Sequence, residues 1–173
     1  MNAPLTPKYL TEDLAKLAVE TALLTAFSED NSISTLMKRR QCHVVVLVPA
    51  MHDARPENYP EWPDYPLFAF PIYQCSFDKE KWEKPYDSIA RCKALQLWGD
   101  RNDDRTDIIP HLLFPGDVPF WGGVKRHEIV VACSGVQPYF DKMISGITAD
   151  IIAALAYDAY VKDEDRNEGI YLT

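Results

Sequence analysis

The sequence lacks the marks of several functional classes. No apolar run approaches the roughly 20 residues of a membrane-spanning helix, so we expect no membrane partner. The opening residues, MNAPLTPKYL, have neither the basic nor the apolar region of a secretory signal, which favours a cytoplasmic protein. Basic residues are few: 18 Lys and Arg stand against 26 Asp and Glu, and the net charge of −8 argues against nucleic acid as a partner. We interpret the short basic cluster 38–40 as a solvated face before a strand.

Closely spaced metal ligands are also missing. The cysteines form no C-x-x-C pair, and the histidines form no H-x-H or H-E-x-x-H pattern. We therefore expect reduced thiols, no disulfide and no structural metal site. These residues are Cys42, Cys75, Cys92, Cys133, His43, His52, His111 and His127.

A phosphate-binding loop is absent as well. Such a loop opens into a helix, whereas Gly122–Gly123 is followed by VKRHEIVV, which is typical of a strand. A glycine pair between short apolar segments favours a hairpin turn, where a positive φ is required. We therefore predict that Gly122–Gly123 is such a turn.

Hydrophobic periodicity predicts three helices. The first spans Thr11 to Phe27, with Thr11 as its N-cap and an apolar face of Leu14, Leu17, Ala18, Thr21 and Leu24. The second spans Pro85 to Gly99, with a stripe of Ile89, Cys92, Leu95 and Trp98 and with Gly99 as its stop. The third spans Tyr139 to Val161.

Strand patterns alternate with these helices. Cys42–Pro49 and Ile129–Cys133 are β-branched runs of strand length, and Tyr65–Phe77 is a strand region in which Pro71 predicts an edge or a bend. Consecutive strands with short connections pair antiparallel, so the sequence predicts an α+β sheet with helices packed against it. The 173 residues fit one domain, and the Pro-rich segment 49–66 is predicted to be a long loop insertion.

The segment from Pro115 to Asp141 gathers the polar residues with catalytic potential. Cys133–Ser134–Gly135 lacks the G-x-S-x-G pattern of a nucleophile elbow. His127 precedes Cys133 by six residues, which is about 20 Å along a strand, so these two do not form a nucleophile and base pair. An acid-base enzyme remains an alternative, with His111 or His127 as the acid or base and Asp117 or Asp141 as the orienting carboxylate. Asp141 also suits the first turn of a helix, where a carboxylate complements the macrodipole.

Residues 86–161 resemble the GlcG-like family, which includes haem-binding HbpS-type proteins and the C-terminal domain of PduO adenosyltransferases. The resemblance is carried by a Lys-Ala pair, a G-G-V-P-I segment, a glycine turn, an S-G pair and an Asp six residues later. The corresponding positions are Lys93–Ala94, Gly116–Phe120 with Asp117 for the second glycine, Gly122–Gly123, Ser134–Gly135 and Asp141. This chain departs from the pattern at Ile129 and Ala132, where the family strand carries glycines, and in the loop 49–66, which replaces a short hairpin.

The resemblance implies a profilin-like domain that associates into dimers or larger rings. Our leading hypothesis is an oligomeric, non-catalytic protein that binds a small molecule such as haem or an organic acid. The resemblance assigns no histidine here as a haem ligand. The expected ligand-binding residues are Lys93, Gly116, Asp117, Phe120, Trp121, Ser134, Gly135 and Asp141. A third hypothesis, an interaction scaffold, rests on the aromatic residues Tyr59, Trp62 and Tyr65 of the long loop.

Overall fold

The computed structural model describes residues 4–52, 67–102 and 108–167. Within them, four strands form one antiparallel sheet in the order β2-β1-β4-β3. The strands are β1 (Cys42–Ala50), β2 (Phe68–Phe77), β3 (Gly123–Arg126) and β4 (Ile129–Ser134). The predicted strands at 42–49 and 129–133 are confirmed, and β2 lies at an edge with an irregular register opposite Pro71, as a residue without a backbone donor requires.

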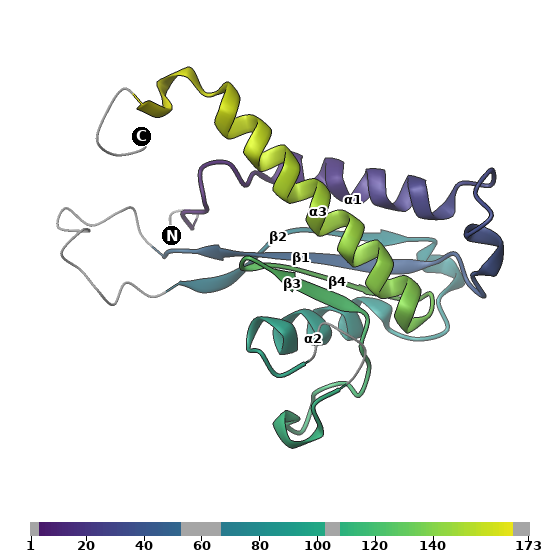
Figure 1. The fold of residues 1–173 in the computed structure, drawn as a ribbon. Helices are drawn as coiled ribbons and strands as arrows, with labels where there is room; N and C mark the ends of the chain where they lie inside the picture. The colour runs from purple at the N-terminus through teal and green to yellow at the C-terminus, as the bar shows by residue number, and fades with distance from the viewer. Residues whose placement is uncertain (1–3, 53–66, 103–107, 168–173) are drawn as a thin grey trace.

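Three helices cover the two faces of this sheet (Figure 1). α1 (Glu12–Phe27) and α3 (Pro138–Lys162) lie on one face, and α2 (Tyr86–Trp98) lies on the other. Alternate residues of β1 serve the two layers: Val44 and Val46 pack toward α1 and α3, whereas Val45 packs toward α2. β1 is therefore apolar on both faces, and the predicted α+β architecture is confirmed. The profilin-like label stays a prediction.

The helix faces differ from those that the sequence predicts. Thr11 does cap α1 by accepting a hydrogen bond from the Leu14 amide at 3.2 Å. However, α1 buries its alanines and Val19, while Leu17 and Leu24 are 52% and 75% exposed. The large apolar residues misled the prediction, because small residues allow a helix to approach its neighbours closely and so occupy the buried side.

On α2 too, the buried side differs from the apolar stripe that the sequence predicts. Its sheet-facing side carries Ala90, Ala94 and Leu97, and Leu95 of the predicted stripe is 55% exposed. Gly99 ends this helix as predicted, and its amide donates to the Leu95 carbonyl at 3.1 Å. The buried side of α2 begins at Tyr86 and includes Lys93, so both residues lie inside the protein.

The hairpin turn is not at Gly122–Gly123, so this prediction was wrong. The turn that joins β3 to β4 is His127–Glu128, where both residues have a positive φ of 48° and 64°. Gly123 instead begins β3 and pairs with Ala132. The positive φ at Gly122 has another cause, which is the close approach of α3.

Most of the predicted loop insertion cannot be compared with the structure. Residues 53–66 of the predicted insertion 49–66 lie outside the described residues, as do Tyr59, Trp62 and Tyr65. At its start, Met51 pairs with Leu5 in an isolated bridge.

One helix in the described ranges, α3, is long and apolar enough to cross a membrane by length and composition alone. Core helices meet the same criterion, and α3 buries Ile144, Thr148 and Ile152 against the sheet layer. The helix thus acts as a packing element along its first turns.

Relieving the strained hairpin turn should stabilise the fold. We expect the double substitution His127→Asn and Glu128→Gly to raise the free energy of unfolding by about 1 kcal/mol, because Asn and Gly tolerate a positive φ at lower cost. Denaturant unfolding followed by circular dichroism measures the change. A loss of stability would contradict the placement of the turn at these two residues.

Candidate functional site

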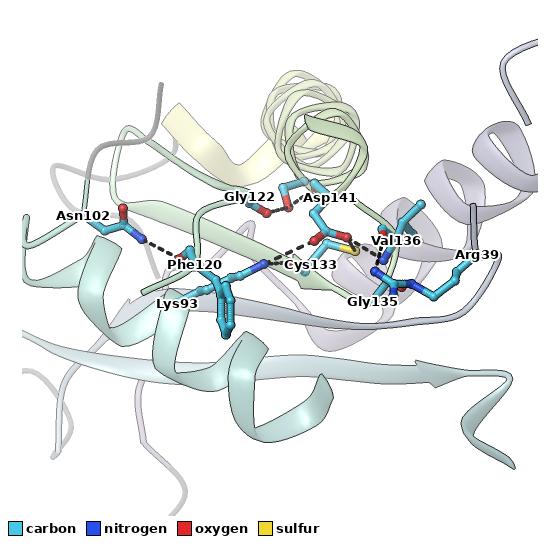
Figure 2. A network of polar contacts seen from close by, with 10 residues as sticks. Arg39, Lys93, Asn102, Phe120, Gly122, Cys133, Gly135, Val136 and Asp141 are labelled. Carbon is cyan, nitrogen blue, oxygen red and sulfur yellow. Dashed lines mark hydrogen bonds and ion pairs between the residues drawn. The ribbon is translucent and has the colours of Figure 1, made fainter. Parts of the chain in front are cut away.

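A buried ion pair joins the two helical layers. Lys93 of α2 donates from Nζ to Asp141 Oδ2 of α3 at 3.2 Å, and the two side chains are only 2% and 5% exposed. Lys93 Nζ also donates to the Cys133 carbonyl of β4 at 3.0 Å. The pair lies where β3 begins and β4 ends, so it connects helices from opposite faces of the sheet (Figure 2).

Two glycines make room for this pair and for the chain around it. A Cβ on Gly122, whose φ is 124°, would lie 2.7 Å from Asp141 Cβ and 2.9 Å from the Pro138 carbonyl. A Cβ on Gly135, whose φ is 136°, would collide with the Gln41 carbonyl. The backbone therefore requires glycine at both positions, and Gly122 serves close approach to α3 instead of a turn.

Both oxygens of the Asp141 carboxylate accept hydrogen bonds from the protein. Its Oδ1 accepts a hydrogen bond from the Val136 amide at 3.0 Å, and its Oδ2 receives Lys93. Burial raises the pKa of Asp141 above the ordinary value, although the attraction of Lys93 and these hydrogen bonds oppose the shift. The backbone amide of Val136, which follows the end of β4, is thus satisfied by a side chain of the protein itself.

Next to the ion pair, the surface forms a hollow of about 170 Å³. Its wall comes from four segments: the approach to β1, the start of α2, the loop before β3, and the connection from β4 to α3. The lining residues are Arg39, Lys84, Tyr86, Ile89, Lys93, Phe120, Ser134, Gly135, Val136, Gln137, Pro138 and Asp141.

Two cations of the hollow have no carboxylate partner among the described residues. Arg39 donates to the Gly135 carbonyl at 3.0 Å and to the Val136 carbonyl at 2.7 Å, and its guanidinium lies 5.9 Å from the Tyr86 ring centre. Lys84 Nζ is 5.7 Å from the centre of the Phe120 ring. The basic cluster 38–40 is thus more than a solvated face, because Arg39 holds the end of β4.

Tyr86 adds a polar group to this wall. Its side chain is buried and its hydroxyl has no hydrogen-bond partner in the described part of the chain. Its ring packs edge-on against Trp82 at 5.6 Å, which itself contacts the buried His43. This aromatic packing holds the Tyr86 ring, and with it the hydroxyl, at the first residue of α2.

Five of the eight predicted ligand-binding residues line the hollow together. They are Lys93, Phe120, Ser134, Gly135 and Asp141. The other three, Gly116, Asp117 and Trp121, are not part of its wall. Asp117 instead forms an ion pair with Arg101 and accepts from the Phe114 amide at 2.8 Å, and these contacts lower the pKa of its carboxyl. Asp117 therefore stabilises the loop before β3.

The catalytic candidates are not brought together. His127 is at the tip of the hairpin, before β4, whereas Asp141 contacts residues at the other end of that six-residue strand, about 20 Å away. His111 is exposed on a short 3-10 helix, and Asp117 is paired with Arg101. Cys133 is also a poor nucleophile, because burial raises the pKa of its thiol well above the usual range.

Sequence reasoning missed Arg39, Lys84 and Tyr86. Arg39 and Lys84 precede β1 and α2, Tyr86 is the first residue of α2, and no motif connects positions so far apart in the chain. The available signal was the helical spacing of Tyr86, Ala90, Lys93 and Leu97, which marks the buried side of α2.

Comparison of this chain with protein-family models, with curated proteins and with solved structures finds no match.

Breaking the buried ion pair should be costly. We expect Lys93→Met to lower the free energy of unfolding by about 3–5 kcal/mol, because it leaves the Asp141 carboxylate buried without its cation. The deficit should shrink as the pH falls toward the raised pKa of Asp141, since the folded variant then binds a proton that the unfolded chain does not yet bind. Denaturant unfolding at several pH values measures both effects.

The matched control is Lys162→Met, which removes an exposed lysine paired with Asp158. Its cost should be at most about 1 kcal/mol. The double variant Lys93→Met with Asp141→Asn should cost less than the sum of its single changes. Equal costs for Lys93→Met and Lys162→Met would show that the buried pair contributes no more than a surface pair.

Proposed function

We propose that this protein binds a small organic anion in the hollow beside the Lys93–Asp141 pair, without catalysing a reaction. The observation that carries the proposal is an excess of hydrogen-bond donors over acceptors. Arg39 uses two of its five donors on backbone carbonyls, and Lys93 uses two of its three. Asp141, the one acidic side chain of the hollow, has both oxygens engaged.

The remaining donors require acceptors, and charge favours anionic ones. Arg39 and Lys84 carry positive charge that no carboxylate of the described chain neutralises. In a protein of net charge −8, such a cationic hollow is a local reversal of the overall field. Charge-assisted hydrogen bonds to a carboxylate are about twice as strong as neutral ones, so an organic acid is the ligand that these residues favour.

The hollow suits an organic acid better than haem. Its volume of about 170 Å³ is below the roughly 300 Å³ at which pockets for drug-sized ligands begin. No described histidine lines it, since His43 is buried under Trp82 and His127 is at the hairpin tip. These residues do not fit the haem proposal that the family resemblance implies.

Catalysis by the residues of the hollow is also disfavoured. Ser134 has no histidine beside it in the hollow, and the Asp141 carboxylate is held by Lys93 and a backbone amide. A general base requires a free acceptor within hydrogen-bond reach of the substrate proton. The residues of the hollow therefore favour a binding function over an acid-base enzyme.

Self-association forms part of the proposal. α1 exposes Leu17 and Leu24, and α3 exposes Tyr157 and Val161. Apolar side chains that form a contiguous exposed patch are typical of sites where protein surfaces meet. We propose that these helix faces support a dimer or a larger homo-oligomer.

Light scattering tests the oligomer directly. We expect a solution mass of at least twice 19.7 kDa at micromolar concentration. Leu24→Glu should lower that mass, because a charge on an associating apolar face is costly to bury. A monomeric wild-type protein over the whole concentration range would refute this part of the proposal.

Thermal unfolding tests the binding function. Sodium salts of small carboxylic acids should raise the melting temperature above that in sodium chloride of equal ionic strength, by an amount that grows with concentration. Lys84→Met should reduce this rise because it removes a cation from the rim of the hollow. Lys16→Met, an equal loss of charge on the exposed side of α1, serves as the control. No rise with any acid would contradict the proposed function.

A further inference from the structure

The part of the hollow that is not cationic is apolar and partly aromatic. Tyr86 and Phe120 contribute two rings, and Ile89, Val136 and Pro138 contribute aliphatic surface. Phe120 is 39% exposed, so part of its ring is accessible to a ligand in the hollow. A ligand that fills the hollow must therefore carry an apolar body as well as a negative charge.

The charges of the lining limit the ligand to one carboxylate. Lys93 is already neutralised by Asp141, so Arg39 and Lys84 are the two cations left for a ligand. If these two cations bind one carboxylate, the lining has no further unpaired cation for a second, and burying an unpaired charge is strongly disfavoured.

Size and shape limit the body of the ligand. A cavity of about 150 Å³ in a protein core holds one benzene molecule. The hollow of about 170 Å³ has room for a ring of that size, and aromatic pairs gain stability beyond the area that they bury. Phe120, which is 39% exposed, supplies such a partner for a planar ring.

We propose, on the basis of the proposed function, that the ligand is an aromatic monocarboxylate of about the size of benzoate. Its carboxylate binds Arg39 and Lys84, and its ring packs among Tyr86, Phe120 and Ile89. The Tyr86 hydroxyl has no hydrogen-bond partner among the described residues, and two of the three ammonium N–H groups of Lys93 are accounted for. These two side chains favour a ring that bears a further hydrogen-bond acceptor, such as a hydroxyl group.

Isothermal titration of the full chain with four compounds tests this inference. We expect benzoate to bind with a Kd of about 1 mM or below. Benzamide, which has the same shape without the charge, should bind at least about tenfold more weakly. Cyclohexanecarboxylate lacks the planar ring, and terephthalate adds a second carboxylate, so both should also bind more weakly than benzoate.

Variants locate the site and separate the two proposals. Lys84→Met and Phe120→Leu should each weaken benzoate binding about three- to tenfold, while Lys16→Met leaves it unchanged, with folding checked by circular dichroism. Benzamide binding as tightly as benzoate, or terephthalate or cyclohexanecarboxylate binding more tightly, would overturn the aromatic monocarboxylate inference but leave a small-molecule-binding function. Failure of benzoate, cyclohexanecarboxylate and terephthalate alike, together with no thermal stabilisation by any carboxylic acid, would overturn both.

Discussion

The site depends on one interaction, the buried ion pair between Lys93 and Asp141. α2 and α3 lie on opposite faces of the sheet, and this pair connects them past the end of β4. Two buried charges are tolerated only when they meet each other and satisfy their remaining hydrogen bonds. Here the Cys133 carbonyl and the Val136 amide supply those bonds, so the backbone at the end of β4 is fixed together with the pair.

The pair also determines the charge of the hollow beside it. Because Lys93 and Asp141 neutralise one another, the electrostatic character of the hollow comes from Arg39 and Lys84. Arg39 has a second task, since it binds the carbonyls of Gly135 and Val136 and so positions the connection to α3. The same groups that hold the fold together at this point leave an excess of donors facing outward, and this excess is what a carboxylate would use.

The sequence predicted the architecture well and the packing poorly. Strands are visible because their apolar runs are continuous, and Thr11 and Gly99 mark helix ends by local chemistry. Helix faces were wrong because size alone does not identify the buried side: alanines of α1 face the core while Leu24 faces solvent. The glycine pair misled the turn prediction, since a positive φ at Gly122 has the same sequence signal whether it serves a turn or a close approach.

The site was predictable only where a local pattern pointed to it. Lys93, Phe120, Ser134, Gly135 and Asp141 were grouped through the resemblance to the GlcG-like family, and the structure brings them to one hollow. Arg39 and Lys84 reach it through the long-range packing of β1 and α2, which no spacing reveals. The most direct measurement of the central claim is the change in backbone amide NMR shifts on adding benzoate. The donor-rich hollow predicts the largest changes at residues 134–137 and at the start of α2, whereas unchanged shifts there, with changes confined to other faces, would contradict it.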